Sequence, residues 1–198
     1  CCLGNRVHRA RNMWLTILCS LLTLRSVSAQ ELFFGNCPSV QPISGFNITR
    51  YLGKWYEQQK YFAVFELGLK CVTAEYAATG INSVSVNNGG QYYFFNLPST
   101  AVGRAVLIPS PDNKAQLAVG FGPFTPSQPN YNVIDTDYTS YTIVYSCSPV
   151  WFFNLQYLWI LTRDRNYPGN SLVERRQKIS SLGIDISRLS VTDQINCT

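Results

Sequence analysis

The stretch Arg50-Tyr51-Leu52-Gly53-Lys54-Trp55-Tyr56-Glu57 decides the fold of this chain. Gly53 permits a backbone turn that other residues rarely adopt, and Trp55 carries a large ring that suits a half-buried pleated strand. The stretch therefore predicts a turn that feeds a strand. Two distant pieces of sequence belong with it: Thr136-Asp137-Tyr138, farther along the chain, and Arg163, at the end of the last expected strand.

Short β-rich runs separated by Gly, Pro, Asn and Asp fill the chain between these pieces. Their spacing is that of hairpins and predicts eight or nine antiparallel strands. The expected strands are Gly53–Lys60, Cys71–Thr79, Ser83–Asn87, Gln91–Phe95, Val102–Ile108, Ala115–Phe121, Asn132–Thr136, Tyr141–Cys147 and Asn154–Arg163. Asn88-Gly89-Gly90 and the run from Pro109 to Asn113 have the composition of turns.

One amphipathic helix is expected after the strands, from about Ser171 to Leu182. Leu172, Ile179 and Leu182 fall on one face of this helix, and Gly183 is placed to end it. Many strands in hairpin order followed by a single helix predict an all-β fold class.

Residues 1–29 have the pattern of a segment that precedes the mature protein. Met13 opens an apolar run that is too short to span a bilayer as a helix, and Val27-Ser28-Ala29 offers the small residues that signal peptidase requires. We expect a secretory signal that is cleaved after Ala29, and we interpret residues 1–12 as an over-extended reading frame. The mature protein is then one domain of residues 30–198, exported from the cell.

Removal of residues 1–29 changes the charge balance of the chain. The segment holds four of the 16 Lys and Arg residues and none of the 11 acidic ones, which leaves 12 basic residues and a net charge of +1. A near-neutral chain lacks the basic footprint of a nucleic-acid binder. The only histidine, His8, is also removed, and with it the commonest general base and metal ligand. We expect no metal site and no nucleic-acid partner.

Four of the seven cysteines follow the expected cleavage site: Cys37, Cys71, Cys147 and Cys197. An even number of cysteines behind a secretory signal predicts two disulfides. The sequence by itself permits three ways of pairing them.

In combination, these segments resemble the lipocalin family. The Gly53-x-Trp55 pair, Thr136-Asp137-Tyr138 and Arg163 are similar to its signature motifs, in the same order and spacing. Four further segments are similar to its apolipoprotein D-like subgroup, which includes insect and crustacean bilin- or carotenoid-binding members; they are Lys70–Tyr76, Val144–Cys147, Trp159–Arg163 and Val191–Cys197. The resemblance implies an eight-stranded antiparallel up-and-down β-barrel that forms a calyx for one small ligand, with the C-terminal α-helix packed outside.

The resemblance also implies roles for particular residues. The subgroup pairs its cysteines in a way that corresponds to Cys37–Cys147 and Cys71–Cys197. The motif residues belong to the scaffold at the closed end of the barrel, where Arg163 lies over the indole of Trp55. The structural motif set is Gly53, Trp55, Thr136, Asp137, Tyr138 and Arg163.

The calyx must be lined by alternate residues of each strand, because successive side chains face opposite sides. Alternation places Leu155, Tyr157, Trp159 and Leu161 on one face, and the resemblance puts Tyr76 and Trp159 in the pocket. The predicted ligand-binding residues are Leu117, Val119, Phe121, Tyr157, Tyr76, Trp159 and Tyr131. Each ring has a second interpretation, since an aromatic residue on the inner face can simply fill the barrel.

The 23 Tyr and Phe and four Trp residues favour a cavity for a flat or elongated apolar molecule. The leading hypothesis is a secreted, extracellular carrier of a fatty acid, sterol or retinoid that requires no cofactor. The alternative is a pigment protein that holds a bilin, such as biliverdin, or a carotenoid, and a third is a structural protein with a filled barrel. We expect no enzyme, because the mature cysteines are all predicted in disulfides and no histidine remains to activate a nucleophile.

Two apolar clusters are expected near the open end, Tyr61–Phe65 and Trp151–Phe153. Such clusters dock on lipid particles, membrane surfaces or another subunit of a homo-oligomer, or else fold inward as a lid. The sequence does not decide between these arrangements. Asn47-Ile48-Thr49 predicts an N-glycosylation site at Asn47, and Asn196-Cys197-Thr198 is a weaker match because its middle residue is expected in a disulfide.

Overall fold

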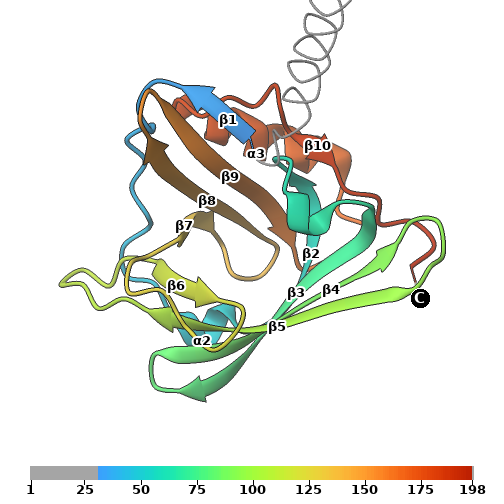
Figure 1. Cartoon of the computed structure of the whole chain (residues 1–198), viewed down its shortest axis with the longest axis horizontal. Coiled ribbons are helices and arrows are strands. Elements are labelled where there is room, and N and C mark those ends of the chain that lie inside the picture. Colours follow the sequence, from blue (N-terminus) through green and yellow to red (C-terminus); the bar gives the residue numbers. More distant parts are fainter. Residues whose placement is uncertain (1–30, 198) are drawn as a thin grey trace, which may run out of the picture.

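The computed structural model describes residues 31–197, so the expected signal segment and its cleavage site lie outside the described residues. Eight strands, β2 to β9, follow one another as antiparallel neighbours, and a pairing of β9 with β2 closes them into a barrel (Figure 1). Two short strands extend the sheet: β1 pairs with β9, and β10 pairs with β2. No helix in this range has the length and apolar character needed to cross a membrane.

The elements have the following bounds. The strands are β1 (Glu31–Phe34), β2 (Gly53–Lys60), β3 (Leu69–Gly80), β4 (Ser83–Tyr92), β5 (Pro98–Leu107), β6 (Gln116–Gly120), β7 (Tyr131–Thr136), β8 (Tyr141–Val150), β9 (Phe153–Thr162) and β10 (Ser190–Val191). The helices are α2 (Ile48–Tyr51), the 3-10 turn η2 (Val64–Glu66) and α3 (Gly169–Ser181). The predicted barrel with a C-terminal helix is confirmed.

Two apolar clusters hold the fold together, one on each side of the barrel wall. The inner cluster fills the closed end and contains Tyr51, Trp55, Tyr76 and Leu117. The outer cluster joins strands β7 to β9 to helix α3, where Ile179 is fully buried among Ile143, Leu158 and Ile160. The helix therefore covers the outside of the barrel and leaves the inside free (Figure 1).

Helix α3 begins two residues before the expected Ser171, with Pro168 at its N-cap position. Leu172 and Leu182 pack with Ile179 against the outer cluster, as the predicted apolar face requires. Gly183 follows the helix with a φ of +77°, a left-handed conformation that glycine adopts without strain.

The structure contradicts the expected turn at Asn88-Gly89-Gly90 and the separate strand at Gln91–Phe95. Strand β4 runs without interruption through both glycines to Tyr92, and the chain reverses only after it. Both glycines pair with β5, Gly89 with Thr100 and Gly90 with Ser99, so the sheet holds them in extended conformation. A Cβ at Gly89 would lie 3.1 Å from Oγ1 of Thr73, which makes glycine the easier fit there.

Both disulfides implied by the family resemblance are present. Cys37 joins Cys147 on β8, and Cys71 on β3 joins Cys197 in the C-terminal segment, with Cα–Cα distances of 5.9 and 5.6 Å. The chain separations are 110 and 126 residues, so each bond fastens a terminal segment to a distant strand of the barrel.

Candidate functional site

The closed end of the barrel is built around Trp55 and Arg163. Trp55 is fully buried and its indole N–H donates to the carbonyl of Tyr51 at 3.0 Å. The guanidinium of Arg163 lies 3.6 Å from the centre of the Trp55 ring. It also donates to five backbone carbonyls, those of Arg50, Tyr51, Leu52, Lys54 and Tyr138. The polar groups of Trp55 and Arg163 therefore all have hydrogen-bond partners, and the two side chains together seal this end of the barrel.

The Thr136-Asp137-Tyr138 turn supports the same seal from the β7–β8 connection. The Asp137 carboxylate accepts hydrogen bonds from the backbone N–H groups of Thr139, Ser140 and Tyr141. Burial works against its charge, but these hydrogen bonds outweigh burial and lower the pKa of Asp137. The turn holds Tyr138 at a φ of +68° and aims its carbonyl at Arg163.

Three tyrosine hydroxyls meet on the cavity side of this seal. The hydroxyl of Tyr131 lies 2.9 Å from that of Tyr51 and accepts from Tyr76 at 2.8 Å, while Thr142 donates to Tyr51. Burial raises the pKa of Tyr51 to about 12 and also raises the pKa values of Tyr76 and Tyr131 well above their ordinary value. The floor of the cavity is therefore neutral and hydrogen-bonding.

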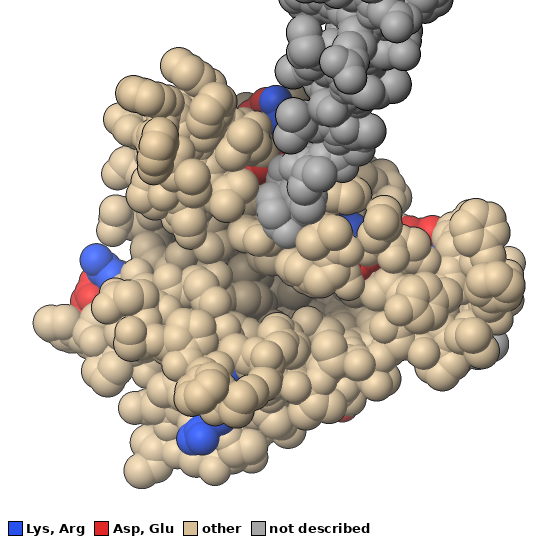
Figure 2. Space-filling view, in the orientation of Figure 1, with Lys and Arg blue, Asp and Glu red and all other residues tan. Residues whose placement is uncertain are grey.

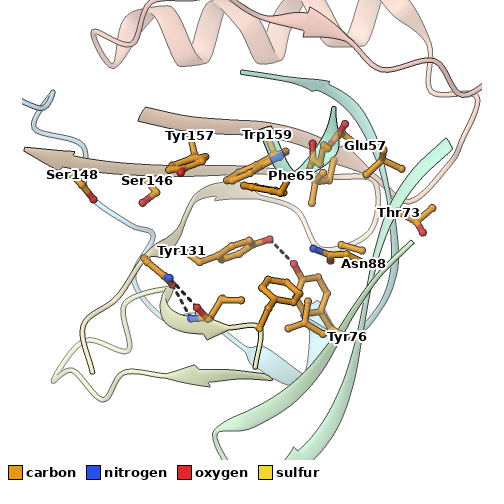
Figure 3. Close-up of a pocket in the computed structure, with 18 residues that line it drawn as sticks. Glu57, Phe65, Thr73, Tyr76, Asn88, Tyr131, Ser146, Ser148, Tyr157 and Trp159 are labelled. Carbon is orange, nitrogen blue, oxygen red and sulfur yellow. Dashed lines mark hydrogen bonds between the residues drawn. The ribbon is translucent and has the colours of Figure 1, made fainter. Parts of the chain in front are cut away.

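Above this floor lies a cavity of about 400 Å³, within the range of small-molecule sites. Its lining is mostly apolar and aromatic. The aromatic lining residues are Phe65, Tyr76, Phe121, Tyr131, Tyr157 and Trp159. Figure 3 shows Tyr76 and Tyr131 on one side of the cavity, opposite Tyr157 and Trp159 on β9. Tyr157 and Trp159 stack with 5.6 Å between ring centres and 9° between planes, and Phe65 also stacks with Tyr157, with 6.2 Å between ring centres.

Six of the seven predicted ligand-binding residues line this cavity: Tyr76, Val119, Phe121, Tyr131, Tyr157 and Trp159. Leu117 does not. Leu117 belongs to the inner cluster around Trp55. It lies two residues before Val119 on β6 and is therefore closer to the closed end. Contact between the six residues and a ligand remains a prediction.

Sequence reasoning missed a charged group in the cavity wall. The Glu57 side chain lines the cavity and is 2% exposed, and Glu66 of η2 lines it as well. Strand alternation from Trp55 could have placed Glu57 inside. A bulge in β2 at Glu57/Gln59 then turns Lys60 inward, where its Nζ contacts both carboxylates, while Gln59 faces outward and accepts from Arg176 of α3.

The described residues offer no obvious metal centre, since no group of three or more His, Cys, Asp or Glu side chains between residues 31 and 197 is arranged to hold an ion. The polar atoms that a ligand would meet are instead hydroxyls, amides and two carboxyl groups. Besides Glu57 and Glu66, the polar lining residues are Thr73, Asn88, Asn130, Ser146 and Ser148.

The four connections at the open end carry exposed aromatic residues. They span residues 61–68, 93–97, 121–130 and 151–152, and their most exposed rings are Phe94 (87%), Phe124 (85%) and Trp151 (95%). Within these connections the one charged residue is Glu66, whose side chain is turned inward to Lys60. Figure 2 shows the hollow of this face between surfaces made almost entirely of uncharged residues.

The two apolar clusters noted in the sequence behave differently. Tyr61 is buried in the outer cluster, and Phe65 reaches into the cavity wall. Trp151 and Phe152 remain exposed and do not line the cavity, so the second cluster does not form a lid in this structure.

Comparison with known proteins gives a consistent picture. The family described as "Lipocalin-like domain" matches residues 46–194. Apolipoprotein D of Bos taurus is 34% identical over 179 residues, which cover 87% of this chain and 89% of that protein. The Lazarillo protein of Schistocerca americana is 34% identical over 184 residues, covering 91% of this chain and 84% of that protein.

Among solved structures, insecticyanin of the tobacco hornworm Manduca sexta superposes with a TM-score of 0.71 and 26% identity. The match covers 83% of this chain and 89% of insecticyanin.

Proposed function

The chain belongs to the lipocalin family, and from that premise we propose that it is a secreted carrier of one small hydrophobic ligand, bound in the cavity between Trp159 and Tyr76. The observation that carries the proposal is the contrast between the sealed floor and the open, aromatic cavity above it. A barrel used only as a scaffold would be filled, whereas this one keeps about 400 Å³ free.

Export from the cell has two supports. The chain forms two disulfides, which persist in oxidising compartments, and the apolar run that Met13 opens, followed by Val27-Ser28-Ala29, has the pattern of a cleavable signal. Asn47 is exposed, and its side-chain oxygen accepts from the N–H of Arg50, so its amide nitrogen is available to carry a glycan. The proposed mature form is a glycoprotein of residues 30–198.

Ligand uptake at a lipid surface follows from the open end. Aromatic side chains favour the interface between water and lipid, and the connections around the cavity mouth present them with almost no charge. A ligand would then pass between a lipid surface and the cavity without crossing water. Of the arrangements that the apolar clusters allow, this proposal selects docking on a membrane or lipid particle.

A carrier role leaves no need for catalysis. The four cysteines in residues 31–197 are all in disulfides, and that range contains no histidine. A titration of free thiols on the mature protein is expected to find none, and a reactive thiol in the cavity would favour an enzyme instead.

The second candidate is a pigment protein that holds a bilin or carotenoid, favoured by the stacked Tyr157 and Trp159 rings, which suit a flat conjugated molecule. An absorption spectrum of protein from its natural source, together with a mass spectrum of its solvent extract, decides between the candidates. A colourless extract that contains a lipid supports the carrier, a visible band supports the pigment protein, and an extract without ligand contradicts both.

A further inference from the structure

Three charged side chains cluster at the cavity wall, and two of them, Glu57 and Glu66, line the cavity. Lys60 Nζ lies 3.0 Å from Oε1 of Glu57 and also contacts Oε2 of Glu66. Thr192, beyond the short strand β10, donates to the same Oε1 of Glu57 at 2.5 Å. Both carboxyl groups line the cavity, and Lys60 is held between them.

The charges that face the cavity are therefore all acidic. Among the described residues that line it, Glu57 and Glu66 carry ionisable acid groups, and none is lysine or arginine. One ammonium group shared by two carboxylates leaves the cluster one positive charge short of neutrality. Because Glu57 is buried, a missing counter-charge acts on it much more strongly than it would in water.

The protein relieves this shortage with a proton. Burial of Glu57, reinforced by the charge of Glu66, raises the pKa of Glu57 to about 8 despite the nearby Lys60. Near neutral pH the Glu57 carboxyl group therefore holds a proton in the place where a second cation would fit.

A separate group points to the same kind of ligand. Oδ1 of Asn88, on the β4 side of the cavity, is buried and accepts no hydrogen bond from residues 31–197. A buried acceptor without a donor is costly, so this site favours a ligand that brings a hydrogen-bond donor. Figure 3 shows Asn88 next to Tyr76 and Glu57 across the cavity, near Phe65 and Trp159.

We propose that the cavity selects apolar ligands that carry a hydrogen-bond donor, with an amine preferred over an alcohol and a carboxylate least favoured, the ammonium group lying against Glu57. This inference rests on the proposed carrier function and narrows its ligand class. An amine supplies the missing positive charge, releases the Glu57 proton and offers donors to Asn88. A carboxylate brings a further negative charge that Lys60 cannot neutralise together with Glu66, so fatty acids and the propionates of a bilin are poor ligands.

The test uses three ligands that differ only in the end group: dodecylamine, dodecanol and dodecanoate. Each is titrated by calorimetry into the mature, disulfide-bonded protein near neutral pH, below the concentration at which it forms micelles. We expect the amine to bind at least about tenfold more tightly than the carboxylate, with the alcohol between them. Amine binding should also release a proton, seen as a heat that depends on the ionisation enthalpy of the buffer.

Two variants locate the effect. Glu57→Gln preserves size and the contact with Thr192, and it should reduce the preference for amine over carboxylate to roughly twofold and abolish proton release. Glu66→Gln gives a second measurement if the first variant folds poorly, and it should also reduce the preference. Glu75→Gln is the matched control, because Glu75 is half exposed and pairs with Lys54 at 3.6 Å outside the cavity; its preference should equal that of the original protein.

The outcomes separate the two proposals. Tight binding of dodecanoate, equal to or better than the amine, overturns this inference and leaves the carrier function standing. An unchanged preference in both Glu57→Gln and Glu66→Gln overturns the assigned residues. Failure of all three ligands, including the neutral alcohol, overturns the carrier function and this inference with it.

Discussion

The two ends of the barrel solve opposite problems with the same kinds of side chain. At the closed end, Arg163 covers Trp55 and donates to five carbonyls, so the aromatic ring is buried and the partly buried cation has hydrogen-bond partners. At the open end, rings such as Phe94 and Trp151 stand in solvent. In the closed-end turns of the described chain, Ile81 is the one large apolar residue exposed in this way.

The contrast separates stability from function. Buried contacts of aromatic rings and a satisfied guanidinium lower the free energy of the folded state, whereas exposed rings contribute little to it. Residues that are left exposed at a cost in solubility therefore point to a surface that something else covers. We expect substitutions at the closed end to change stability and substitutions at the open end to change binding.

The disulfides give the largest expected effect, and they sharpen the comparison because they fasten terminal segments to strands near the open end. The double variant Cys71→Ser/Cys197→Ser should lose about 4–5 kcal/mol of unfolding free energy, since the bond spans 126 residues and restricts the unfolded chain. Urea unfolding of the variant beside the original protein measures this loss. Peptide mapping without reduction checks the pairing, and a Cys37–Cys71 peptide would contradict it.

Arg163→Ala is expected to lose roughly 2–4 kcal/mol, because it removes a partly desolvated cation–π contact and leaves five carbonyls without their donor. Ligand preference should not change, because Arg163 does not line the cavity. Arg165→Ala is the control, since Arg165 lies over Tyr56 on the outer side of the same strand pair. If Arg163→Ala lost ligand binding but kept the denaturation curve of the original protein, the closed end would serve binding and not stability, which would contradict the roles assigned here.

Glu57 should make stability depend on pH in a known direction. Burial raises its pKa to about 8 from an ordinary value of 4.5, so the folded state binds more protons than the unfolded state between these values. Its contribution is fully present below about pH 4.5 and is lost as the pH rises through about 8, by up to about 1.4 kcal/mol per pH unit. In Glu57→Gln this loss should disappear, so the variant should gain stability over the original protein as pH rises from 5 to 8; a constant difference would contradict the raised pKa.

Substitutions at the mouth should have the smallest effect on stability. Phe94→Ser and Trp151→Ser are expected to change the unfolding free energy by less than about 0.5 kcal/mol, because both rings are exposed. Their binding to neutral phosphatidylcholine vesicles should fall about tenfold together, since two rings leave the lipid interface. Ile81→Ser at the closed end is the control and should leave vesicle binding unchanged.

Local chemistry predicted much of this molecule. Hairpin spacing predicted the strands, the resemblance to lipocalins implied that they close into a barrel, and strand alternation placed Tyr157, Trp159 and Val119 in the cavity wall. Alternation alone could not set depth, which is why Leu117 was expected in the cavity and lies below it. How deep a side chain lies in the barrel depends on its distance from the closed end. That distance is set by the arrangement of all the strands and not by one strand alone.

Two other features depended on contacts between distant strands. Gly89 and Gly90 have the composition of a turn, yet they continue β4, where both pair with β5 and Gly89 also pairs with β3. The Lys60 side chain points inward because of a bulge where β2 pairs with β9. The alternation of residues along β2 does not predict this bulge. Alternation from Trp55 could have placed Glu57 in the cavity wall, but not Lys60 beside it.

The central claim is that ligand binds in the open half of the barrel, whereas the closed half only stabilises the fold. Tryptophan fluorescence emission tests this claim most directly. Three tryptophans lie in the described range, at the closed end (Trp55), in the cavity (Trp159) and at the exposed rim (Trp151). Titration with dodecanol should change the emission of the original protein and of Trp151→Phe equally, and should leave Trp159→Phe nearly unchanged while calorimetry still detects binding. An equal change in Trp159→Phe would place the ligand elsewhere and contradict the account.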